Sequence, residues 1–143
     1  MTAPARAVLL DTHAAIWWME GSLSPDVAGQ LVTAGLSEGV FVSPISAWEI
    51  GMLARRGDKQ AAPQFLPDPA VWFATLMSKP TVRPAPFTPE IAIAVSFLPG
   101  AFHSDPADRF LVATARAMNI PLMTRDGKIA DYAALGHVEV VPC

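Results

Sequence analysis

Apolar positions along the chain fall into two alternating patterns. Short, nearly continuous apolar runs, bounded by turn residues, are typical of buried strands. The runs predicted as strands are 7–11, 40–43, 121–126 and 138–141. Residues 81–87 also resemble a strand, but their prolines confine such a strand to a sheet edge or exclude it.

Longer segments between these runs show helical spacing, and most open with a capping residue followed by proline. This pair is a helix start, because the cap accepts a backbone N–H and proline needs no donor in the first turn. Such pairs stand at 24–25, 43–44, 68–69, 88–89 and 105–106, and two further helices are predicted at 12–20, ended by Gly21, and at 127–135. Strands that alternate with helices predict an α/β domain with a mostly parallel sheet.

Composition sets limits on this domain. The 143 residues suit a single domain, 1–143, with its own core, and 52% of them are hydrophobic while 16% are charged. So much apolar surface favours a covering partner protein, with a well-filled core as the alternative. The net charge of −3 argues against a general nucleic-acid coat. It leaves open a nuclease that holds phosphate through a metal.

Cellular context follows from what the sequence lacks. Cys143 is the single cysteine, so no internal disulfide is expected. No signal-like segment and no apolar run of about 18 residues is present, and we therefore expect a cytoplasmic protein without a membrane span.

Two acids stand where predicted strands end. Asp11 follows four apolar residues, and a buried carboxylate without a partner is costly. Asp126 ends the run PLMTRD, where a plain turn before Gly127 is the alternative. Ligands of parallel sheets bind beyond the carboxyl ends of strands, so both acids are expected to face one crevice.

Two more acids lie on apolar faces of predicted helices. Glu49 falls within the stripe formed by 45, 48, 52 and 53, where a solvated glutamate is not expected. Asp108 shares a face with Leu111, although it can also serve as a helix-start acid next to the capping Asp105.

These four acids together indicate a cation. Two carboxylates about 4 Å apart repel by roughly 4 kcal/mol at an effective dielectric near 20. Mg²⁺ or Mn²⁺ relieves this repulsion through oxygen ligands, and such an ion can activate water toward a phosphodiester. Thr12 and Thr124 are placed to orient ligands or water.

Four segments, VLLDTHAAIWW, VSPISAWEIGMLARRG, FHSDPADRFLVATA and PLMTRDGKIADY, together with HVEVV, resemble PIN-domain proteins in their order and spacing. They are most similar to VapC-type toxins of bacterial toxin–antitoxin pairs, and the resemblance covers essentially the whole chain. It implies an α/β/α sandwich around a parallel sheet and a Mg²⁺- or Mn²⁺-dependent ribonuclease. It further implies a cognate VapB-like antitoxin that blocks the site, and assembly as a homodimer and as a hetero-oligomer with that antitoxin.

The resemblance also implies roles for particular residues. The family's acidic site falls on Asp11, Glu49, Asp108 and Asp126. Supporting positions fall on Thr12, Ser46 and Thr124, with Asp105 as a helix cap or an outer supporting group.

Basic residues suggest where RNA binds. Arg55, Arg56 and Lys59 form the tightest cationic group, at the end of the helix that bears Glu49. Phosphate contact and helix-dipole stabilisation are both open interpretations of this group. Arg125 and Lys128 flank Asp126 and are further candidates.

Histidines give weaker signals. His13 follows Asp11 closely but is predicted on the opposite side of the helix, and His103 is interpreted as a loop or packing residue. His13 also stands where an aspartate-nucleophile phosphatase needs a second aspartate, which argues against that enzyme class. No G-x-G-x-x-G follows the first strand, which argues against dinucleotide binding. A DNA-directed nuclease and a non-catalytic RNA- or partner-binding module remain the alternatives.

Overall fold

The fold is a five-stranded parallel sheet between two layers of helices. A computed structural model describes residues 5–56 and 65–143. Its strands are β1 (Ala7–Leu10), β2 (Gly39–Val42), β3 (Val82–Pro84), β4 (Leu122–Thr124) and β5 (Val140–Pro142). They lie in the order β3-β2-β1-β4-β5, and every pairing is parallel. The predicted α/β class is confirmed, and the proline-rich segment at 81–87 supplies only the edge strand β3.

Helices occupy the segments between the strands. They are α1 (Thr12–Glu20), α2 (Pro25–Gly35), α3 (Pro44–Arg55), α4 (Pro69–Met77), α5 (Pro89–Ala94), the 3-10 turn η1 (Val95–Phe97), α6 (Pro106–Met118) and α7 (Gly127–Ala134). All five predicted cap–proline starts are confirmed, because each capping side chain accepts a backbone N–H of its own helix. Gly21 ends α1 in the left-handed region at φ 73°.

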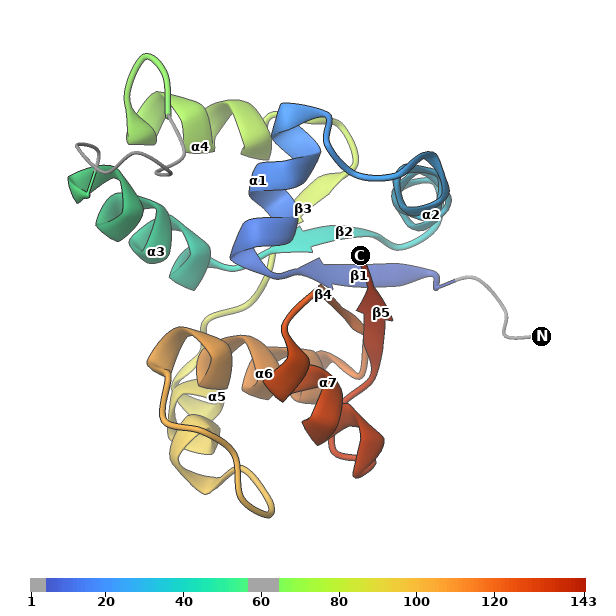
Figure 1. The fold of residues 1–143 in the computed structure, drawn as a ribbon, viewed down its shortest axis with the longest axis vertical. Coiled ribbons are helices and arrows are strands. Elements are labelled where there is room, and N and C mark those ends of the chain that lie inside the picture. The colour runs from blue at the N-terminus through green and yellow to red at the C-terminus, as the bar shows by residue number, and fades with distance from the viewer. Residues whose placement is uncertain (1–4, 57–64) are drawn as a thin grey trace.

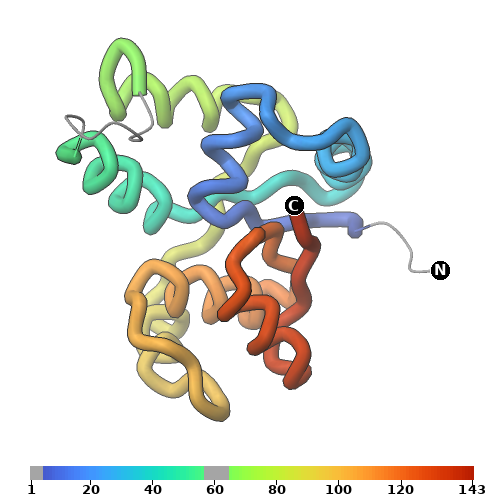
Figure 2. The backbone as a smooth tube through the Cα atoms, viewed as in Figure 1, coloured from blue at the N-terminus to red at the C-terminus, as the bar shows by residue number. Residues whose placement is uncertain are grey.

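Alternation along the strands produces two separate cores. Val8 and Leu10 of β1 pack into the core beneath α1, α2 and α4, whereas Leu9 packs into the core beneath α6 and α7. In β4, Leu122 and Met123 divide in the same way. Figure 1 shows α1, α2 and α4 above the sheet and α5, α6 and α7 below it, and the chain trace in Figure 2 shows the same two layers. The predicted α/β/α sandwich is therefore confirmed.

The predicted apolar stripe of α3 is partly wrong. Trp48 is 48% exposed, whereas Ile50, outside the predicted stripe, is fully buried. The reason is packing: α3 lies against α1, α4 and α6 together, so it buries small Ser46 beside Ile45 and turns the bulky Trp48 outward.

Trp17 and Trp18 of α1 are adjacent, and both are only partly buried. The segment 58–67 has the composition of a loop, and most of it lies outside the described residues. Within 5–56 and 65–143, the helices are too short or too polar to cross a membrane.

Candidate metal centre

The carboxyl ends of β1 and β4 lie side by side at the point where the strand order of the sheet reverses. The first crossover leads from β1 to β2 on one side, and β4 later pairs with β1 on the other. Such a switch point is the usual ligand crevice of an open parallel sheet. Asp11 directly follows β1 there, and its backbone N–H donates to the Met123 carbonyl at 3.0 Å.

Asp11 occupies the capping position of α1 but does not cap it. Its side chain instead accepts a hydrogen bond from Thr124 Oγ1, with 2.6 Å between Oγ1 and Oδ2. The same Thr124 hydroxyl oxygen accepts from the backbone N–H of Asp126 at 3.0 Å. One buried threonine thus fixes a carboxylate of β1 and the backbone of the acid after β4.

A second hydroxyl network holds Glu49. Thr12 Oγ1 donates to Glu49 Oε1 and lies 2.9 Å from Ser46 Oγ. Thr12 and Ser46 are completely buried, whereas Glu49 is only partly buried. The first turn of α1 therefore aims the α3 glutamate at the crevice.

The third group lies on α6 and α7. Oxygen atoms of Asp108 and Asp126 and a ring nitrogen of His103 all lie within 4.8 Å of one another. Both helices begin at this place: Asp105 Oδ1 accepts from the Asp108 N–H at 3.3 Å, and Asp126 Oδ1 accepts from the N–H groups of residues 128 and 129. Asp126 uses only Oδ1 for its cap, which leaves Oδ2 available to a ligand.

Burial and mutual repulsion make the acids hard to ionise together. The pKa of Asp108 is raised to about 7, first by burial and then by the charges of Asp11, Asp105, Asp126 and Glu49. Burial also raises the pKa of Asp11, against the hydrogen bond from Thr124, and that of Glu49, against the hydrogen bond from Thr12. Within the described part of the chain, the charged forms of these carboxylates therefore lack a neighbouring cation that would stabilise them.

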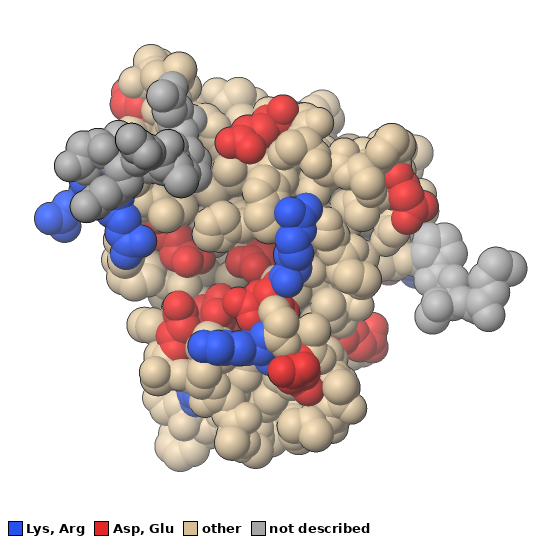
Figure 3. Space-filling model, viewed as in Figure 1, with Lys and Arg blue, Asp and Glu red and all other residues tan. Residues whose placement is uncertain are grey.

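Space for a ligand lies beside the acids. A cavity of about 700 Å³ lies between the starts of α6 and α7, with Asp105, Asp108, Asp126, Asp131 and Lys128 in its wall. Figure 3 shows acidic side chains gathered in a hollow in the middle of this face, with basic side chains around its margin.

The basic residues predicted to bind RNA lie in two different places in the structure. Arg55 and Arg56 lie at the end of α3, where Arg56 is exposed, and Lys59 lies outside the described residues. Arg125 lies over the Trp17 ring, 3.8 Å from its centroid, and donates to the Cys143 carbonyl at 2.8 Å. Its guanidinium is therefore fixed by protein contacts next to the acidic hollow.

His103 is the residue of the site that sequence reasoning misses. It lies in the loop before α6 and packs on Phe102, as the sequence suggests, but its Nε2 also lies 3.1 Å from Asp108 Oδ2. The available signal is its position two residues before the capping Asp105, where a side chain can fold back over the first turn of α6. His13 is exposed.

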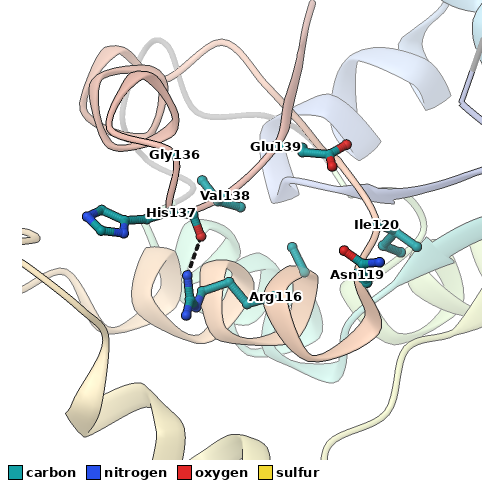
Figure 4. A pocket seen from close by; sticks show the side chains of 8 residues that line it. Arg116, Asn119, Ile120, Gly136, His137, Val138 and Glu139 are labelled. Carbon is teal, nitrogen blue, oxygen red and sulfur yellow. Dashed lines mark hydrogen bonds between the residues drawn. The ribbon is translucent and has the colours of Figure 1, made fainter. Parts of the chain in front are cut away.

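A second cavity, of about 270 Å³, lies at the opposite edge of the sheet (Figure 4). Ile120 and Glu139 in its wall precede β4 and β5, so it opens at the amino ends of these strands. Arg116 within it is used structurally, since its Nη1 donates to the His137 carbonyl. The acidic hollow is the better candidate site.

A three-layer parallel α/β fold with carboxylates near its switch point is a class of domain whose acidic cluster could hold a cation. The chain belongs to the PIN-domain family: the family model described as PIN domain matches residues 8–135.

Relatives agree with this assignment. The chain is 32% identical over 125 residues to ribonuclease VapC22 of Mycobacterium tuberculosis (strain ATCC 25618 / H37Rv), and the match covers 87% of this chain and 91% of that protein. A similar solved structure is VapBC2 of Rickettsia felis bound to a promoter DNA fragment, with a TM-score of 0.66, 13% identity, and 95% of this chain and 98% of that chain covered. Another is FitAcB of Neisseria gonorrhoeae, with a TM-score of 0.54, 19% identity, and 93% and 95% covered. At these identities the two structures support the fold alone.

The residues present fit a divalent cation. Carboxylate oxygens suit hard ions, and a cation offsets the repulsion that raises the pKa values of these acids.

Proposed function

We propose that this protein is a metal-dependent endoribonuclease that acts as the toxin of a toxin–antitoxin pair and hydrolyses RNA phosphodiesters. The observation that supports this most directly is that Asp108 and Asp126 lie together in a PIN domain, close enough to Asp11 and Glu49 for the charges of these acids to raise the pKa of Asp108. Similarity to ribonuclease VapC22 supports the choice of RNA.

Four carboxylates would hold the ion, directly or through water: Asp11, Glu49, Asp108 and Asp126. A bound Mg²⁺ or Mn²⁺ would supply an activated water and charge stabilisation for phosphodiester hydrolysis. Oxygen donors support these two ions over softer metals.

The chain's own residues would orient this centre and the RNA. Thr124 holds the Asp11 carboxylate, and Thr12 holds that of Glu49, so neither acid has to reorganise when the ion binds. Lys128 and Arg125 flank the hollow, and Arg55 and Arg56 extend the basic margin along α3. These side chains would contact the phosphates on either side of the scissile bond.

A cognate VapB-like antitoxin and a second copy of the chain are the proposed protein partners. Apolar side chains support this, because Trp48, Phe87 and Phe110 line an open groove of about 460 Å³ between α3 and α6. The similar structures VapBC2 and FitAcB carry names of two-component assemblies. We infer a cytoplasmic location, where RNA and such an antitoxin are available. Light scattering of the chain alone, and after co-expression with a candidate VapB-like antitoxin, tests both assemblies.

The deciding experiment is cleavage of total cellular RNA by purified, antitoxin-free protein. Reactions contain Mg²⁺ or Mn²⁺, and the controls are EDTA and the nearly isosteric Asp11→Asn variant. Metal-dependent fragments that disappear in the variant support the ribonuclease. Cleavage of single-stranded DNA instead of RNA would indicate a DNA-directed nuclease, and binding of RNA by folded protein without cleavage would indicate a non-catalytic module.

A further inference from the structure

His103 lies in the acidic hollow but is not a member of the proposed set of metal-binding carboxylates. Its side chain is 20% exposed and that of its neighbour Asp108 15% exposed, with 3.1 Å between Nε2 and Oδ2. The other charged groups of the hollow that face it are carboxylates and the ammonium group of Lys128. An imidazole in this position can either coordinate a cation or hold a carboxylate that does.

The other ring nitrogen distinguishes these two roles. Nδ1 accepts a hydrogen bond from the backbone N–H of Asp105 at 3.4 Å, so Nδ1 has no proton and the neutral ring bears its proton on Nε2. A histidine that coordinates a metal normally shows the reverse arrangement, in which the second nitrogen donates its N–H to an acceptor. The hydrogen bonding therefore favours Nε2–H as a donor toward Asp108.

The chain also fixes the loop that bears His103. Arg109 donates to the carbonyls of Phe102 and His103 through Nη1, at 3.1 and 3.3 Å, and to the Val95 carbonyl through Nε and Nη2, at 3.1 and 2.8 Å. The Phe102 ring packs on His103 with 4.4 Å between centroids and on Tyr132 with 4.6 Å. A loop held by one guanidinium to three carbonyls brings the imidazole to the same place each time.

We propose that His103 is a positioning residue: its Nε2–H holds Asp108 Oδ2 and thereby directs the other oxygen of this carboxylate to the cation. In this structure the 3.1 Å contact does not have the geometry of a hydrogen bond, so the proposal requires the Asp108 carboxylate to rotate and complete it. Hydrogen bonds in unliganded sites commonly tighten in this way when the ligand binds. The inference rests on the metal centre of the proposed function but not on the identity of the nucleic acid.

Mn²⁺ binding tests this role without any RNA. We would titrate Mn²⁺ by electron paramagnetic resonance into wild type, His103→Phe and His103→Gln. Loss of a group that orients a metal ligand typically weakens metal binding by about 10–100-fold. We expect a loss in this range for His103→Phe and a smaller loss for His103→Gln, whose amide can still donate to Asp108. His103→Phe can disturb packing, so its melting temperature is measured alongside. If His103→Phe misfolds, the Mn²⁺ affinity of His103→Gln decides whether His103 has the proposed role.

Pulsed resonance of bound Mn²⁺ separates the two roles of the imidazole. We expect no strong coupling from a directly bonded nitrogen in wild type. A nitrogen coupling that disappears in His103→Gln would make His103 a ligand and overturn the proposal. Unchanged Mn²⁺ affinity in folded His103→Phe would overturn it as well.

His137→Gln is the matched control. His137 lines the second cavity, away from the acids, but its ring packs on Tyr132, which also packs on Phe102. It should bind Mn²⁺ as wild type does. Failure of wild type to bind Mn²⁺ would remove the metal centre itself, whereas Mn²⁺ binding without RNA cleavage would overturn only the ribonuclease.

Discussion

Thr124 Oγ1 donates to Asp11 Oδ2 at 2.6 Å and joins two residues that are 113 positions apart in the chain. Both are buried, and they lie at the carboxyl ends of neighbouring strands. The first catalytic candidate is thus held by a hydroxyl from the last third of the sequence.

Replacing Thr124 by valine should therefore weaken the metal centre. The change keeps the shape of the side chain but leaves the buried Asp11 carboxylate without its donor, which costs about 1–3 kcal/mol. We expect Mn²⁺ affinity to fall by about 10–100-fold, measured by calorimetric titration. Thr124→Ser keeps the hydroxyl and should bind Mn²⁺ nearly as wild type does. Equal affinity in the valine variant would contradict the role assigned to this bond.

Asp11→Asn should stabilise the metal-free protein while it abolishes cleavage. Burial and the charge of Asp126 raise the pKa of Asp11, so an uncharged amide of the same shape relieves an unfavourable group. We expect a gain of about 0.5–2 kcal/mol in the free energy of unfolding, measured by urea titration in EDTA. Glu20→Gln removes one negative charge at an exposed position and serves as the control. Destabilisation by Asp11→Asn would contradict the view that this site is strained without a cation.

Stability of the metal-free protein should depend on pH through Asp108. Its pKa is about 7 in the folded protein, above its ordinary 3.8, because burial and neighbouring carboxylates disfavour the charged form. Between these two values the folded state binds more protons than the unfolded state, so stability falls as pH rises from about 4 to about 7. Thermal melts in EDTA across this interval check the slope, which Asp108→Asn should flatten.

Metal binding should oppose that trend. Coordination requires the deprotonated carboxylate, so Mn²⁺ binding near pH 6 should release protons and raise the melting temperature more at pH 7.5 than at pH 5.5. Titrations in buffers of different ionisation enthalpy measure the released protons. No proton release from wild type would contradict ionisation of Asp108 on binding.

Arg55→Ala/Arg56→Ala should weaken RNA binding and its dependence on salt. For single strands, the slope of log K against log salt becomes shallower by about 0.7 for each phosphate that the protein no longer neutralises. Fluorescence anisotropy with Asp11→Asn as the background measures binding without cleavage. Arg6→Ala is the control, since Arg6 pairs with Glu38 at 3.6 Å next to the amino end of β1. An unchanged slope in the double variant would indicate that the two arginines only stabilise the end of α3 and do not contact phosphate.

Local signals made most of the fold predictable. A cap followed by proline marks a helix start through the chemistry of a few adjacent atoms, so helices such as α2 and α6 begin where the sequence predicts. The buried face of α3 was less predictable, because contacts with three other helices, and not the most apolar side chains, decide that Ile50 is buried and Trp48 exposed.

The proximity of the acids was predictable, whereas the hydrogen bonds that connect them were not. Asp11 and Asp126 could be placed together because strand ends in a parallel sheet share one edge. The contact between His103 and Asp108 depends on the Arg109 hydrogen bonds that fold the loop back onto α6. No local pattern in the sequence encodes that geometry.

The position of β4 between β1 and β5 makes the complete site depend on the order of synthesis. Asp11 and Glu49 are synthesised before Asp126, which follows a strand that pairs with β1. A nascent chain that stops before β4 lacks both that acid and the hydroxyl that holds Asp11. Its central strand also has one unpaired edge until β4 arrives, and such long-range parallel pairing is slow to form. The site is therefore finished only after β4 has been synthesised and has paired with β1.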